Sequence, residues 1–159
     1  MSLSMALLMG MIACQRPAER ACNPPCRYDA PCIDGACQCP LPFEGTSCES
    51  DARDRFTGTW EGRRRCGGIR SGLRYTIWRH DSLLLFMNIA GSFYGSAEET
   101  LQIRLLDPYQ IQIPPQILRD TPLYVSGYGE QRRDSLILRL QVQGGANRID
   151  TCYWDLKKR

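Results

Sequence analysis

Residues 134–143 read DSLILRLQVQ, and this stretch decides the fold class because apolar side chains occupy every second position. The apolar positions are Leu136, Leu138, Leu140 and Val142. The intervening positions carry isoleucine, arginine and two glutamines. An alternation of period two is typical of a β-strand with one buried and one solvated face. The stretch therefore predicts a half-buried strand within an all-β domain.

The same alternation recurs throughout residues 55–159. Turn-forming pairs such as Asp107-Pro108 and Gly144-Gly145 separate the alternating runs. Eight strands are predicted, over residues 57–63, 72–80, 83–90, 94–105, 109–114, 122–130, 134–143 and 148–157. The short connections imply hairpins and hence an antiparallel meander. Because the number of strands is even, the first and last can pair and close a barrel without sheet edges.

The sequence leaves two features of this barrel open. Ser96 and Glu99 form the capping box of a helix, whereas the alternation over 101–105 and Pro108 favour a strand. Small eight-stranded barrels either fill their interior with side chains or hold one small ligand. The predicted inward side chains are bulky, which favours a filled interior over a ligand cavity. They are Trp60, Tyr75, Ile77, Leu84, Phe86, Leu101, Ile103, Leu136, Leu138 and Trp154.

Nine cysteines and a single histidine, His80, indicate the compartment in which the chain folds. No C-x-x-C pair is present, and zinc sites are usually built from such pairs or from histidines. Many cysteines without a metal pattern indicate disulfides formed in an oxidising environment. The formal net charge of +3 is too small to argue for nucleic acid as a partner.

Two cysteines lie in the barrel region, with Cys66 near the end of the first predicted strand and Cys152 within the last. A disulfide between them would join the two strands that close the barrel. The antiparallel register set by this bridge also aligns two pairs of opposite charge. These pairs are Arg63 with Asp155 and Glu61 with Lys157. In the chain-entropy model, a disulfide that closes so long a loop stabilises the fold by roughly 4–5 kcal/mol.

An uncharged apolar run, Met5–Ala13, immediately precedes Cys14. It is too short to span a bilayer, which needs ~20 residues, but it has the length of a signal-peptide core. The run and its cysteine resemble the lipobox of bacterial lipoproteins. The resemblance implies a signal peptide over 1–13, lipid on Cys14, and a lipidated N-terminus and tether over 14–21. The alternatives are a signal peptide without lipid and a disordered apolar start.

The lipoprotein resemblance also implies a location. Gln15, rather than an aspartate, follows Cys14, which in this family implies sorting to the bacterial outer membrane, facing either the periplasm or the cell surface. The cysteine count agrees with lipidation. Once Cys14 is assigned to lipid, six cysteines remain between residues 22 and 48 and two in the barrel, so all eight can pair.

Residues 22–48 contain six cysteines and almost no branched aliphatic side chains, so this segment needs disulfides to hold it together. Six cysteines can pair in many ways, and spacing alone does not choose among them. Residues 37–48 read CQCPLPFEGTSC, which resembles the EGF-like pattern of C-x-C, an aromatic residue, a glycine and a last cysteine. The resemblance implies the disulfides Cys22–Cys32, Cys26–Cys37 and Cys39–Cys48.

Several details of this segment fit an EGF-like module. Asp34-Gly35 predicts a hairpin turn, Phe43 can cover the last disulfide, and Gly45 can supply a positive φ. Calcium-binding EGF-like modules carry several oxygen ligands just before the first cysteine. Glu19 is the only such candidate, so no metal is expected. Residues 49–54, ESDARD, predict a short charged linker to the barrel.

The region 55–159 resembles the small lipocalin-like barrels attached to bacterial surface lipoproteins. The resemblance is carried by the G-x-W opening, FTGTW at 56–60, and by residues 111–114, residues 125–129 and Cys152. It implies an eight-stranded barrel and says more about fold than about function.

No group of residues forms a catalytic pattern. His80 lies in a predicted turn, and the adjacent Glu98 and Glu99 point to opposite faces of a strand. We expect a membrane-anchored lipoprotein that acts, without enzymatic activity or cofactor, as a protein- or glycan-binding module. The basic runs 63–65 and 157–159 would lie together near one rim, as a solvated face or as a surface for an acidic partner. The alternatives are a carrier of a small apolar ligand and a secreted hydrolase inhibitor.

Overall fold

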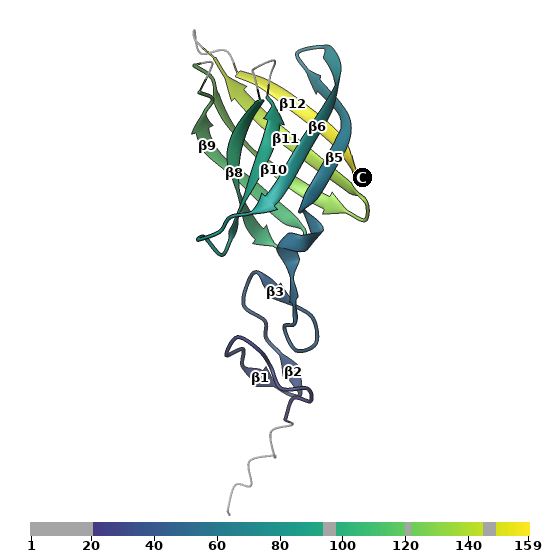
Figure 1. The fold of residues 1–159 in the computed structure, drawn as a ribbon, viewed down its shortest axis with the longest axis vertical. Coiled ribbons are helices and arrows are strands. Elements are labelled where there is room, and N and C mark those ends of the chain that lie inside the picture. The colour runs from purple at the N-terminus through teal and green to yellow at the C-terminus, as the bar shows by residue number, and fades with distance from the viewer. Residues whose placement is uncertain (1–20, 94–97, 120–121, 145–148) are drawn as a thin grey trace, which may run out of the picture.

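The computed structural model describes residues 21–93, 98–119, 122–144 and 149–159. A β-barrel forms most of the molecule, and a disulfide-rich N-terminal module lies at one end of it (Figure 1). The predicted signal peptide, Cys14 and the tether up to residue 20 lie outside the described residues, as does Glu19. Within the described ranges, no helix is long and apolar enough to cross a membrane.

Eight antiparallel strands form the closed barrel, which confirms the predicted all-β meander. They are β5 (Gly58–Cys66), β6 (Ile69–Arg79), β7 (Phe86–Ser92), β8 (Glu98–Asp107), β9 (Gln110–Ile117), β10 (Tyr124–Arg132), β11 (Ser135–Gln143) and β12 (Ile149–Lys158). Each strand pairs with its neighbour in sequence, and β12 pairs with β5 to close the barrel. Closure gives each barrel strand two neighbours and so removes the edge strands to which another chain could add a strand.

The closing seam is bridged by a disulfide. Cys66 of β5 lies directly opposite Cys152 of β12, with their Cα atoms 4.4 Å apart, and the two sulfurs are bonded. The same register places Glu61 opposite Lys157, although the two do not form an ion pair. Instead, the Glu61 carboxylate accepts hydrogen bonds from Arg74 and Arg159, which hold its pKa below the usual value.

The barrel interior is packed with large apolar side chains, and all but two of the predicted inward residues are buried. The exceptions lie around β7, where Leu84 is 53% exposed and Phe86 is only half-buried. Here the prediction of which alternate side chains face the interior is wrong, because Met87 and Ile89 point inward. Residues 83–87 are all apolar, so no alternation marks the face that is buried.

Parts of the interior are packed so tightly that the inward positions there require glycine. A Cβ atom at Gly91 would lie 2.2 Å from a ring carbon of Tyr75. A Cβ atom at Gly129 would lie 2.4 Å from a methyl carbon of Leu138. Both distances are far below van der Waals contact, so these layers of the barrel are filled by the neighbouring side chains.

Strand β9 continues through Pro114 and Pro115 to Ile117, beyond the predicted end at residue 114. Prolines lack the N–H that a central ladder needs. The backbone pairing of β9 with β8 accordingly stops at Gln112, whereas β9 stays paired with β10 up to Ile117. The Gln116 side chain then bonds to the backbone of β8 and keeps the two strands together.

The N-terminal module consists of two small two-stranded sheets and three disulfides. The sheets are β1 (Cys32–Ile33) with β2 (Ala36–Cys37) and β3 (Phe43–Glu44) with β4 (Ser50–Asp51). The disulfides join Cys22 to Cys32, Cys26 to Cys37 and Cys39 to Cys48, the same pairs that the EGF-like resemblance implies. Both turn residues between β1 and β2 have positive φ, Asp34 at 52° and Gly35 at 82°, as two-residue hairpins favour.

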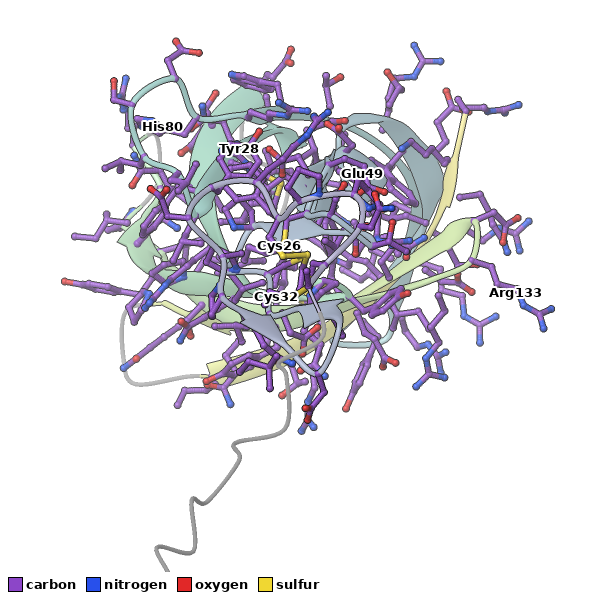
Figure 2. All side chains as sticks on the ribbon, turned by 90° about the horizontal axis from the view of Figure 1, so that it is seen from below. Cys26, Tyr28, Cys32, Glu49, His80 and Arg133 are labelled. Carbon is purple, nitrogen blue, oxygen red and sulfur yellow. A yellow bond between two sulfur atoms is a disulfide. The ribbon has the colours of Figure 1, made fainter. Side chains whose placement is uncertain are left out.

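A short 3-10 helix, η1 (Ala52–Arg55), connects the module to the barrel, within and just after the segment predicted as a linker. Asp51 caps this helix by accepting a hydrogen bond from the Arg53 N–H. Ala52 and Phe56 are fully buried, and the Trp60 indole N–H donates to the Phe56 carbonyl. Helix η1 therefore packs against the module end of the barrel core. Seen from the module side, Cys26 and Cys32 lie in front of the end of the barrel (Figure 2).

Candidate functional site

A line of tyrosine and arginine side chains crosses the outer surface of the barrel. Each member lies directly opposite the next on a neighbouring strand, and side chains paired in this way point to the same face of a sheet. In order from β10 through β11, β12 and β5 to β6, the members are Tyr128, Arg139, Tyr153, Arg65 and Arg70. We call these five residues the Tyr-Arg row.

The Tyr-Arg row is exposed and carries unneutralised charge. Tyr128 and Tyr153 are 60% and 47% exposed, and the Arg139 guanidinium lies over the Tyr153 ring, 5.8 Å from its centre. In the described ranges, no carboxylate lies within salt-bridge distance of Arg65, Arg70 or Arg139. No carboxylate of the described residues pairs with these charges, so they can bind an anion.

Two hollows lie along the Tyr-Arg row. One, of about 560 Å³, is lined by outward side chains that include Tyr153, Arg65 and Arg70 and by Arg63 and Asp155 of the adjacent positions. Asp155 lies opposite Arg63 in the strand register, but no ion pair joins them. The other, of about 370 Å³, is lined by residues that include Tyr128 and Arg139. The row thus combines hollows, aromatic rings and positive charge.

The residues of the two basic runs, 63–65 and 157–159, point in different directions and make different contacts. Arg63 and Arg65 point outward, whereas Arg64 between them points into the barrel and donates to the Ser71 hydroxyl. In the C-terminal run, Arg159 binds Glu61 and Lys157 binds Asp134. Lys158 turns back to the barrel end, where its ammonium donates to the carbonyls of Asp54 and Arg55. The two runs therefore meet only in part, since Arg63, Lys157, Lys158 and Arg159 line one hollow, whereas Arg64 and Arg65 are not part of its lining.

Sequence reasoning missed Arg70, Arg139, Tyr128 and Tyr153 as surface partners of Arg65. The five residues are scattered over five strands, and only the strand register brings them into one line. The alternation within each strand indicates which of its side chains point outward. The alignment of neighbouring strands, however, was predicted only for the β5–β12 seam.

A second polar feature lies inside the barrel, next to the seam disulfide. Arg64 and Trp154 are directly opposite each other on the inner face. The Arg64 Nη1 and the Trp154 Nε1 are both buried donors with no hydrogen-bond partner in the structure. Trp154 is only 2% exposed and stacks on Tyr75, with the ring centres 4.6 Å apart. Burial raises the pKa of Tyr75, so its hydroxyl stays protonated and donates to the Ser92 carbonyl.

The remaining chemically versatile groups make structural contacts. His80 Nδ1 accepts hydrogen bonds from the N–H groups of Ser82 and Leu83 and so orders the β6–β7 loop. Glu99 accepts a hydrogen bond from the Arg119 N–H. The sulfurs of three cysteines of the module lie within 4.8 Å of one another. These cysteines, Cys22, Cys26 and Cys37, are all in disulfides and so offer no thiolate to a metal.

The fold defines a small closed antiparallel barrel that carries a disulfide-rich module. No family model and no curated protein sequence matches the chain. Among solved structures, the chain is similar to one described as "EF1p2_mFAP2b bound to DFHBI", with a TM-score of 0.54 and 11% sequence identity. The match covers 68% of this chain and 97% of the other, and at this identity it shows the fold alone.

Proposed function

We propose that this protein is an exported, non-enzymatic binding protein whose barrel holds an acidic partner, protein or glycan, on the Tyr-Arg row. In this proposal Cys14 carries the lipid that attaches the chain to the bacterial outer membrane. The disulfide-rich module is an EGF-like spacer between the anchor and the barrel. The four disulfides support an oxidising, extracytoplasmic environment.

The observation that carries the proposal is the absence of carboxylate partners for Arg65, Arg70 and Arg139 in the part of the chain that the structure describes. A guanidinium forms paired, charge-assisted hydrogen bonds with carboxylate, sulfate or phosphate groups. Elsewhere on the same strands, Arg74 shares Glu61 with the C-terminal Arg159. The arginines of the row have no such partner in the described ranges, although they line hollows that are large enough for one.

The position of the Tyr-Arg row also fits a contact surface. Arg65 and Tyr153 lie one residue from the seam disulfide, at the end of β5 that is remote from the N-terminal module. Figure 1 shows that the module extends from the opposite end of the barrel. An anchor attached through the module would hold the Arg65 and Tyr153 end of the row at a distance from the membrane, where a large partner can reach it.

A charge-matched pair of variants tests this proposal. Arg65→Ala with Arg70→Ala removes two arginines of the row, whereas Arg74→Ala with Arg159→Ala removes two that are paired with Glu61. Binding of fluorescent polyglutamate and of hyaluronan oligosaccharides to the folded protein is measured at two salt concentrations. We expect the first variant to lose roughly tenfold in affinity for its preferred polyanion. Equal affinities for the two variants would overturn the proposal.

The interior offers a second candidate function, that of a small-ligand carrier. The observation in its favour is the pair of buried donors, Arg64 Nη1 and Trp154 Nε1, which share the inner face and have no hydrogen-bond partner among the described residues. A ligand with an apolar body and an acceptor group would satisfy both. The solved barrel with this fold is described as bound to DFHBI, which gives such a role a precedent.

Titration with the anionic, apolar fluorophore anilinonaphthalene sulfonate tests the carrier function. Saturable, blue-shifted fluorescence that disappears in Arg64→Met but remains in Arg70→Met would place the probe inside the barrel. If both variants respond like the unmodified protein, the interior is not a binding site for it.

A further inference from the structure

We infer that the Tyr-Arg row binds a linear anionic glycan that carries its acidic group on alternate sugars. The inference rests on the proposed function, because it names the partner class for the same outer surface. It is drawn from three properties of the row: the spacing of its charges, the placement of its aromatic rings, and the hollows beside it.

The spacing of the charges favours a sugar chain. Neighbouring strands lie ~4.8 Å apart, so Arg139 and Arg65, two strands apart, are separated by ~10 Å measured along the sheet. This is about the length of two linked sugar rings. An extended acidic peptide repeats its side chains on one face every ~7 Å, which does not match this separation. A carboxylate on every second sugar therefore meets Arg139 and then Arg65, and Arg70 lies on the strand directly beyond Arg65.

The aromatic rings occupy the positions between the charges. Tyr153 lies between Arg139 and Arg65, and Tyr128 lies on the other side of Arg139. Both rings are about half exposed on a polar surface. The Arg139 guanidinium lies over one face of Tyr153, and the ring surface that stays exposed gains nothing from packing. The flat C–H face of a sugar can cover such a ring, so a glycan uses the tyrosines and the arginines in turn. A peptide of aspartates or glutamates leaves the rings uncovered.

The two hollows supply the depth that a chain of rings needs. They lie beside the two halves of the row, one at Tyr153 and Arg65 and the other at Tyr128 and Arg139. The amide side chains of Gln112 and Gln141 line the second hollow and can bond to sugar hydroxyls. Amides and hydroxyl-bonding groups are unnecessary for a partner that is recognised by charge alone.

The experiment compares four probes that separate charge from sugar. They are hyaluronan oligosaccharides, which carry a carboxylate on every second sugar, polyglutamate, single-stranded oligothymidylate and neutral dextran. Affinities for the full-length protein are measured by fluorescence anisotropy. We expect hyaluronan to bind at least roughly tenfold more tightly than polyglutamate or oligothymidylate, and dextran to bind most weakly.

Tyrosine variants provide the decisive contrast. Tyr128→Leu with Tyr153→Leu keeps apolar side chains on the strands and removes the flat rings from the row. The matched control is Tyr124→Leu, because Tyr124 is a 53% exposed tyrosine of β10 outside the row. We expect the double variant to weaken hyaluronan binding about tenfold while leaving polyglutamate binding and the melting temperature unchanged. The control should bind both probes as the unmodified protein does.

The outcomes separate this inference from the proposed function. The glycan inference is overturned if polyglutamate or oligothymidylate binds as tightly as hyaluronan. It is also overturned if the double tyrosine variant binds hyaluronan as tightly as the unmodified protein does. The proposed function survives that result as long as removal of Arg65 and Arg70 still weakens binding. If the arginine variant binds every probe like its charge-matched control, both are overturned.

Discussion

The side chain of Gln116 forms two hydrogen bonds with the backbone of Gln102 on the neighbouring strand. The Gln102 N–H donates to Gln116 Oε1 at 2.8 Å, and Gln116 Nε2 donates to the Gln102 carbonyl at 2.7 Å. The amide group of the side chain thus copies the donor and acceptor of a backbone peptide. It does so just after Pro114 and Pro115, where β9 has no N–H groups to offer β8.

Replacing Gln116 with alanine should therefore loosen the β8–β9 seam locally. We expect a loss of roughly 1 kcal/mol in the free energy of unfolding, and faster hydrogen exchange at the Gln102 amide. Gln141→Ala removes another glutamine from the outer surface and should change neither quantity. Unchanged protection of the Gln102 amide in the Gln116 variant would show that the seam holds without this contact.

The disulfide between Cys66 and Cys152 should make a large contribution to the stability of the barrel. It links residues 86 positions apart, and the chain-entropy model gives roughly 4–5 kcal/mol for a loop of this length. Replacing both cysteines with alanine should lower the free energy of unfolding by about this amount in urea denaturation under non-reducing conditions. The β5–β12 ladder should still form, so the far-ultraviolet spectrum of the folded state should be preserved. A stability equal to that of the unmodified protein would contradict the entropic account.

The filled interior can be tested with a series of glycine-to-alanine variants. At Gly91 and Gly129 the added methyl group would meet Tyr75 and Leu138 at 2.2 and 2.4 Å. Such overpacking costs typically ~1–3 kcal/mol. Gly72 is the matched control, because an added methyl there would have no atom within 4 Å. We expect the first two variants, and not the third, to melt at lower temperature. Equal melting temperatures for all three would indicate spare room in the barrel.

The alternation of apolar and polar residues predicted the barrel because it shows directly that a strand has one buried face, as at Leu136 and Leu138, and one exposed face. It failed around β7, where Leu84 was assigned inward and is exposed, because a run of consecutive apolar residues has no parity. The surface site was harder to foresee. Tyr128 and Arg139 lie on neighbouring strands, and their adjacency follows from a strand register that hydrophobic pattern alone does not specify.

The connection between module and barrel should be sensitive to acid through Asp51. Its side chain is only 10% exposed and is bonded to Arg53. Burial alone would raise the pKa of Asp51, but hydrogen bonds from Arg53 and the charges of Arg53 and Arg79 lower it on balance. A carboxylate with a lowered folded-state pKa stabilises the fold fully above its unfolded pKa of about 4 and loses this contribution as the pH falls further.

We therefore expect Asp51→Asn to lower the free energy of unfolding by roughly 2 kcal/mol at neutral pH and to flatten its decline below about pH 4. Asparagine can still cap η1, so the change isolates the effect of charge. Asp54→Asn is the control, because Asp54 contacts Arg79 at the surface and its side chain is 56% exposed. Urea unfolding followed across the acid range measures both effects. If the two variants have the same pH profile, Asp51 is not the group responsible.

Lipid attachment at Cys14 makes a prediction that does not depend on the barrel. In a bacterial host that processes lipoproteins, the unmodified chain should incorporate radioactive palmitate and sediment with membranes, and Cys14→Ser should do neither. A single acyl chain binds a bilayer only weakly, whereas two or more acyl chains on one protein hold it firmly. The labelled form should therefore resist extraction by high salt. Cys14→Ser should retain all four disulfides, since the eight other cysteines are paired among themselves. If Cys14→Ser still takes up label, the lipid is attached at another residue. If the unmodified chain takes up none, the segment before Cys14 acts as a plain signal peptide, and the barrel is a secreted rather than an anchored binding module.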